Sequence, residues 1–181
     1  MKTIARLLML GLALVVTLGC PERTERTDSG GVLLEVAFVD TVGVVSVNAN
    51  PRLSIETITV NSIVAQPGGA TSSLMDVEVE SYEVTYQRVD NGTRVPPAFV
   101  NNILSTVPVG GTLTLTNYPV MTVDQLRNPP LSDLLFENGG FDKETGNTNI
   151  KLNLTIRFFG RTLSGREVSS VPRAQTIEFV Q

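Results

Sequence analysis

The chain has 181 residues, of which 41% are hydrophobic and 18% charged, and its formal net charge is −4. This length fits one domain that buries a sizeable core without disulfides or a structural metal. The absence of His and Trp and the single Cys exclude the usual ligand sets of zinc, copper or haem and any His-based general base. Removing residues 1–19 takes away two basic residues and leaves a charge of about −6, which argues against a nucleic-acid partner.

The first 19 residues have the parts of a secretion signal. A basic start is followed by an apolar run over residues 7–18 and by a small residue before Cys20. The alternative is a membrane-spanning helix, which needs about 20 apolar residues. The polar residues 21–26 follow too early for that, so we predict a signal peptide over residues 1–19.

The run Val16-Thr17-Leu18-Gly19-Cys20 resembles the lipobox of bacterial lipoproteins, although the family prefers Leu where Thr17 stands. The resemblance implies that Cys20 becomes the first mature residue, with a thioether-linked diacylglycerol and an amine-linked acyl chain such as palmitate. Such chains would attach the protein to a membrane. Pro21 is not the aspartate that retains many family members at the inner membrane, so the resemblance favours the outer membrane of a two-membrane bacterium.

Residues 20–31 are predicted to be a lipidated cysteine and a flexible tether, because they mix charges with Thr, Ser and Gly and show no apolar period. Fully extended, this stretch spans about 36 Å. The folded part, residues 32–181, is therefore expected to stay close to the membrane.

The folded part opens with β-rich runs. Residues 32–39 and 42–47 predict a first strand that bends or switches sheets at Asp40-Thr41. Residues 54–65 alternate well and predict a second strand, which ends at a Pro-Gly turn.

Residues 74–89 change the parity of their apolar positions. The two valines that open the stretch lie at odd positions, whereas the apolar residues from Tyr82 to Tyr86 lie at even ones. Because a strand keeps its phase, we expect a bulge or bend near Glu80-Ser81. Tyr82, Tyr86 and Phe158 share their parity with aliphatic neighbours, which favours core packing over an exposed aromatic binding stripe.

The pattern then weakens. Residues 98–107 are ambiguous, and residues 111–116 alternate as another strand. Periodicity lapses over residues 119–148, where residues 123–127 and 133–136, each preceded by a hydroxyl residue that can cap it, predict short helical turns. This insertion is longer than a structureless connection usually is, which favours it as a contact surface.

The end of the chain gives the clearest signal. In residues 149–158 every even position is apolar and every odd one polar, which predicts a strand with one buried face. A turn over residues 160–165 and a second β-rich segment ending at Val180 predict a closing hairpin. Val171-Pro172 implies an edge or a bulge there, since Pro cannot donate to a ladder.

Together these elements predict an all-β fold, an immunoglobulin-like antiparallel β-sandwich of about seven to eight strands over residues 32–181. Residues 154–168 resemble the last hairpin of the immunoglobulin-like or fibronectin type III-like domains of many bacterial lipoproteins, and residues 82–88 resemble their central strand. The antibody pattern of paired Cys around Trp is missing, so the resemblance implies only the broader sandwich class. Such domains mostly bind or space rather than catalyse.

One loop carries a weak calcium candidate. Oxygen-bearing side chains alternate over residues 142–149, and Asp142, Glu144 and Asn147 are the candidate ligands. The stretch lacks the full EF-hand spacing and its closing bidentate Glu, and the same residues are ordinary turn formers. A solvated turn is therefore the favoured interpretation, and we predict no cofactor and no other metal.

The only carboxylate group of catalytic interest is Asp76, Glu78 and Glu80, which share one strand face. Paired carboxylates act as acid and base in glycoside hydrolysis. The same spacing is what a solvent-facing side of a strand requires, and this is the favoured interpretation.

We therefore predict a lipid-anchored protein of the bacterial cell envelope that acts as a non-catalytic binding or structural module, with an envelope protein or glycan as partner. Two alternatives stay open: an envelope hydrolase that uses acidic residues, and an accessory subunit of an outer-membrane assembly. The sequence leaves open the ligand, the oligomeric state and whether the protein faces the periplasm or the cell surface.

Overall fold

The computed structural model describes residues 31–48 and 52–181, and in these ranges the chain forms nine strands and four short helical turns. The predicted signal peptide and Cys20 lie outside the described residues. The strands are β1 (Val32–Val39), β2 (Val44–Ser46), β3 (Leu53–Val64), β4 (Val77–Arg88), β5 (Phe99–Val107), β6 (Thr112–Met121), β7 (Asn149–Thr162), β8 (Glu167–Val171) and β9 (Arg173–Val180). The helical turns are α2 (Val123–Arg127), η1 (Ser73–Met75), η2 (Leu131–Leu134) and η3 (Phe136–Asn138).

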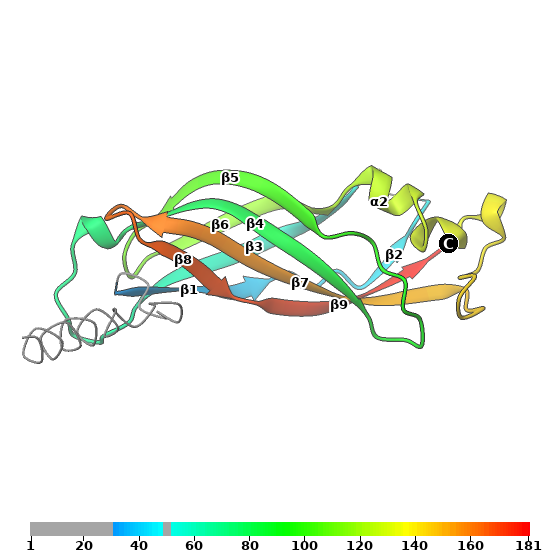
Figure 1. Cartoon of the computed structure of the whole chain (residues 1–181), viewed down its shortest axis with the longest axis horizontal. Helices are drawn as coiled ribbons and strands as arrows, with labels where there is room; N and C mark the ends of the chain where they lie inside the picture. The colour runs from blue at the N-terminus through cyan, green and yellow to red at the C-terminus, as the bar shows by residue number, and fades with distance from the viewer. Residues whose placement is uncertain (1–30, 49–51) are drawn as a thin grey trace, which may run out of the picture.

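The strands pack as two layers around one core (Figure 1). One layer has the order β5-β4-β7-β9-β2 and the other β1-β3-β6, and β8 pairs with both β7 and β1, so hydrogen bonds join the layers into one open sheet. The order β5-β4-β7-β9 opposite β1-β3-β6 is that of an immunoglobulin-like sandwich. The predicted all-β sandwich is therefore confirmed.

Two details of that prediction are wrong. The described chain has nine strands rather than seven or eight, and the sheet is mixed, because β1 runs parallel to β8 and β2 runs parallel to β9. The extra strands arise where the first segment divides into β1 and β2 and where the returning chain divides into β8 and β9. The first segment leaves the β3 layer after Val39 and joins β9 in the other layer at Val44, which is the predicted switch of sheets. Strands at the two ends of the chain thereby become parallel neighbours.

The alternation of β7 appears as burial of one face. Its even residues from Ile150 to Phe158 are at most 1% exposed. The strand runs on to Thr162 before the turn, and the returning chain divides at Pro172 into β8 and β9. Pro172 thus stands where the returning chain changes partners, β8 pairing with the end of β7 and with β1, and β9 with the earlier part of β7 and with β2.

The predicted bulge in β4 is confirmed. The register of β4 shifts between Val79 and Ser81 against both of its neighbours, β5 and β7. The extra residue moves the inward face from odd to even positions, so that Val79 and Tyr82 both become fully buried. Opposite the bulge lies Gly160 of β7, where a Cβ would overlap the carbonyl oxygen of Glu78.

Aromatic side chains join the two layers at the centre of the core. Tyr82 on β4 is fully buried, and its ring centroid lies 5.5 Å from that of Phe158 on β7 and 5.8 Å from that of Tyr118 on β6. The Tyr82 hydroxyl donates to the carbonyl of Pro119 and that of Tyr86 to the carbonyl of Val120. The predicted core role of Tyr82, Tyr86 and Phe158 is confirmed.

Candidate functional site

The predicted insertion, residues 119–148, starts later in the structure, because β6 runs on to Met121. The insertion over residues 122–148 is a packed structure at one end of the sandwich. It begins with α2, whose predicted bounds and cap are confirmed: Thr122 accepts from the amide of Gln125, and the Gln125 side chain accepts from the amide of Thr122. Gln125 also donates to the carbonyl of Pro97 at 2.6 Å. Four leucines of the insertion are buried, Leu126, Leu131, Leu134 and Leu135.

The second predicted helical turn, residues 133–136, is placed differently. It consists of the two 3₁₀ turns η2 and η3, with Leu135 extended between them, and η2 starts after Pro130 instead of Ser132. Pro130 is the N-cap of η2, and although it offers no side-chain cap, its own backbone is already helical, with φ −85° and ψ −16°. Ser132 instead lies buried inside η2, and its carbonyl accepts from the amide of Leu135 and from the side chain of Asn138.

Arg88 holds the insertion to the sandwich through a buried ion pair. Its Nη2 donates to Asp142 Oδ2 at 2.8 Å, and its Nε donates to Asp90 Oδ1 at 2.6 Å. The Arg88 side chain is 2% exposed and that of Asp142 is fully buried. A guanidinium that bridges two carboxylates in this way has its charge compensated and its N–H donors hydrogen-bonded without contact to water. Arg88 and Asp142 are 54 residues apart in sequence, and their ion pair fixes β4 and the insertion to each other.

Further charged residues surround the Arg88–Asp142 ion pair. Arg94 donates to Asp133 Oδ2 at 2.8 Å and to Asp142 Oδ1 at 3.5 Å. Glu144 accepts from the amides of Thr93 and Arg94 at 2.8 and 2.9 Å, so the loop after β4 is also held. We call these residues the Arg88 cluster: Arg88, Asp90, Arg94, Asp133, Asp142 and Glu144.

The calcium candidates are thus placed in a different role. Asp142 gives its oxygens to Arg88, Arg94 and the Thr145 hydroxyl, and Glu144 gives its oxygens to the loop after β4. Asn147 is exposed and contributes its backbone carbonyl, which accepts from the amide of Asp142. Within residues 31–48 and 52–181 no group of acidic, His or Cys side chains is arranged to hold a metal ion. The predicted solvated turn is wrong for Asp142, because the ion pair with Arg88 lets this carboxylate be buried.

The Arg88 cluster was not predicted from the sequence, although the position of Arg88 in β4 gave one signal. Arg88 has the same parity as Tyr82, Val84 and Tyr86, so the buried face of β4 continues through it. An arginine that ends a buried apolar series requires a buried acidic partner. The sequence alone does not show which distant acid supplies it.

Ion pairing in the cluster has a consequence at acid pH. Burial alone would raise the pKa of Asp142, but hydrogen bonds from Arg88, Thr145 and the amide of Glu144 outweigh it and lower that pKa from 3.8 to about 2. Because the folded-state pKa is depressed, the stabilisation of about 2 kcal/mol is fully present above about pH 4 and is lost as the pH falls towards 2.

We predict the following for Asp142→Asn. The variant unfolds at lower urea concentration than the wild type at pH 6, and the difference shrinks steadily below pH 4, since the wild-type carboxylate then also becomes protonated. Urea unfolding of both proteins between pH 6 and pH 2 measures this. A difference that does not change with pH would contradict the role of the charged carboxylate.

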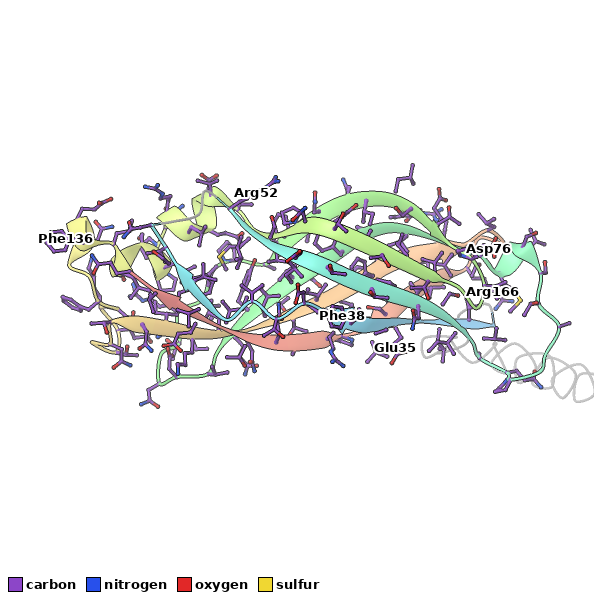
Figure 2. All side chains as sticks on the ribbon, turned by 180° about the vertical axis from the view of Figure 1, so that it is seen from behind. Glu35, Phe38, Arg52, Asp76, Phe136 and Arg166 are labelled. Atoms are coloured by element: carbon purple, nitrogen blue, oxygen red, sulfur yellow. The ribbon has the colours of Figure 1, made fainter. Side chains whose placement is uncertain are left out.

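An aromatic tip, Phe136 and Phe141, projects from the insertion that the cluster supports. Phe136 is 80% exposed and Phe141 44%. Phe136 lies at the extreme end of the molecule, opposite to the end that carries Asp76 (Figure 2). Its turn closes with bonds from the amides of Gly139 and Gly140 to the carbonyls of Phe136 and Leu135, and both glycines adopt positive φ.

The carboxylates considered for hydrolysis do not share one strand face as predicted, because Glu78 and Glu80 lie on β4 whereas Asp76 precedes the strand and ends η1. Asp76 lies at the end opposite to this tip (Figure 2). Glu80 forms an ion pair with Arg161 at 2.6 Å, and Asp76 accepts from the amide of Val109 at 2.8 Å. The depression beside Glu80 has a volume of about 500 Å³ and is lined by Arg161 and Glu167 among others. Two of the three candidate carboxylates are therefore engaged in structural contacts.

In the part of the chain that the structure describes, no helix has the length and apolar character needed to cross a bilayer. The chain matches no known protein-family model and no curated protein sequence.

Proposed function

We propose that this protein is a lipid-anchored, non-catalytic binding module of the bacterial envelope, which uses the aromatic tip to contact a partner protein. The observation that carries the proposal is that Phe136, a large apolar side chain, is 80% exposed on a turn that buried leucines and ion pairs hold in place. An exposed aromatic ring on a preorganised support is typical of the residues that dominate protein interfaces.

The anchor is supported by the sequence. A basic start, an apolar run and the lipobox-like residues 16–20 support a lipid on Cys20, and the residue after it favours the outer membrane. Intact-mass analysis of the protein purified from bacterial membranes tests this. The proposal predicts a mature chain that starts at Cys20 and carries a diacylglycerol and an acyl chain. An unacylated mature start would contradict it.

The choice of a protein partner follows from the chemistry of the tip. The Phe136 ring suits an apolar recess of a protein partner, in which a large aromatic side chain can be fully desolvated. The partner chain of such an interface would cover both phenylalanines and contact the neighbouring polar residues Glu137 and Asn138 on η3. This also includes the case in which the protein is an accessory subunit of a larger envelope assembly.

We predict that Phe136→Ala lowers recovery of the partner by at least about tenfold, because loss of an interface anchor costs about 2 kcal/mol or more. The measurement is quantitative mass spectrometry of proteins that co-purify after crosslinking in intact cells. Leu104→Ala is the matched control, since Leu104 on β5 is 79% exposed and lies outside the insertion. Equal recovery with both variants would contradict the proposal.

A further inference from the structure

Two leucine side chains are exposed at the end of the sandwich opposite to the aromatic tip. Leu74 on η1 is 57% exposed, and Leu163 in the turn between β7 and β8 is 51% exposed. The two turns are bound to each other, because the amide of Ser164 donates to the carbonyl of Leu74 at 3.0 Å and that of Leu163 donates to the carbonyl of Asp76 at 2.9 Å. Both leucines are therefore held at the same end of the molecule.

Three further exposed apolar side chains lie on β1, β3 and β8. Leu33 on β1 stands directly opposite Ile63 on β3, and these side chains are 46% and 42% exposed. They line a shallow groove of about 250 Å³ together with Val171, which is 67% exposed, and the groove is also lined by the charged residues Glu35 and Arg173. We call the surface formed by Leu33, Ile63, Leu74, Leu163 and Val171 the apolar end.

The chain from Cys20 arrives at this same end. The carbonyl of Gly31 accepts from the amide of Ala65 at 2.9 Å, and a Cβ on Gly31 would lie 2.8 Å from the Met75 methyl group of η1. In Figure 1, β1 begins beside η1 and the turn between β7 and β8, at the opposite end from α2. Ten residues lie between Cys20 and Gly31, so the lipid lies within about 36 Å of Gly31.

We propose that the apolar end rests on the surface of the lipid bilayer that holds Cys20. This inference depends on the lipid anchor of the proposed function. Transfer of exposed leucine, isoleucine and valine side chains from water into the headgroup region lowers the free energy. The short connection raises the effective concentration of this end at the bilayer, so even weak contact is populated. The sandwich then stands on the membrane and presents Phe136 away from it.

The experiment places a fluorescent label at Leu163→Cys in the full, lipidated protein. A thioether at Cys20 leaves that sulfur unreactive, so a thiol-reactive, polarity-sensitive dye labels only the introduced cysteine. The protein is reconstituted into phosphatidylethanolamine and phosphatidylglycerol vesicles with or without lipids that carry a nitroxide quencher. Phe136→Cys and Leu104→Cys are labelled in the same way as controls.

We expect blue-shifted emission and several-fold stronger quenching at position 163 than at positions 136 and 104. Adding Leu74→Asp to the labelled Leu163→Cys protein is expected to reduce the quenching, because a charge beside the label opposes entry into the lipid. If the protein floats with the vesicles but position 163 is quenched no more than position 136, this inference is overturned and the anchor stands. If the protein is not acylated and does not float, the anchor and this inference both fail.

Discussion

Replacement of Arg88 by Met is expected to lower the free energy of unfolding by about 3–5 kcal/mol, because this is the cost of removing one partner of a buried ion pair. Met fills much of the same volume but leaves Asp142, which is fully buried, without its main donor. Asp90 loses its partner in the same change. Chemical unfolding at pH 7 measures the loss, and hydrogen exchange should show that residues 122–148 open first.

Arg161→Met is the control for this effect. Arg161 also pairs with a glutamate, Glu80, at 2.6 Å, but its side chain is 55% exposed. An exposed pair contributes less than about 1 kcal/mol. Similar losses of unfolding free energy in the two variants would contradict the claim that burial makes the Arg88 ion pair more stabilising than an exposed one.

A second large effect is expected at Gly160. Gly160→Ala should destabilise the protein by about 3 kcal/mol, because its Cβ would overlap the carbonyl oxygen of Glu78 and lie 2.9 Å from the Cα of Val79. The obstacle is the backbone of β4 at its bulge, which cannot rotate away as a side chain can. Thermal or urea unfolding of the variant gives the magnitude.

Gly43→Ala is the matched control, since a Cβ on Gly43 meets no atom within 4 Å. It should change the free energy of unfolding only slightly. If Gly160→Ala is as stable as Gly43→Ala, then β4 and β7 do not approach each other as closely as the structure shows.

Local patterns predicted the elements that local forces determine. The strict alternation of β7, the phase change at Glu80-Ser81 and the capping hydroxyl of Thr122 each act within a few residues, and the structure contains all three features. Residues 98–107 gave no clear period because β5 has few buried positions, and yet they form a strand through pairing with β4. Tertiary pairing decides such segments.

Features that depend on distant partners were beyond the sequence patterns. The parallel pairing of β2 with β9 joins segments more than 130 residues apart, for which alternation carries no information. The same is true of Arg88 and Asp142. Asp142 reads as a turn residue in its own loop, and only the fold brings it against an arginine at the end of a buried strand face. The aromatic tip was included in the predicted contact segment, but its exposure follows from the packing of the leucines behind it.

The two ends of the sandwich are therefore chemically different in a way that suits the proposed function. The apolar end receives the chain that comes from Cys20, and the opposite end presents Phe136 on a braced turn. The Arg88 cluster lies between β4 and the insertion and connects the insertion to the sandwich through hydrogen bonds and ion pairs. This arrangement limits the entropy lost when the tip binds a partner.

The most direct test is photocrosslinking in living cells from a benzoylphenylalanine placed at position 136, with the same residue at position 104 as the control. The two positions are almost equally exposed, so the comparison separates recognition from accessibility. We predict one discrete protein adduct from position 136 that is absent from position 104. Equal, diffuse labelling from both positions, or no adduct from position 136, would contradict the claim that the aromatic tip is the binding surface.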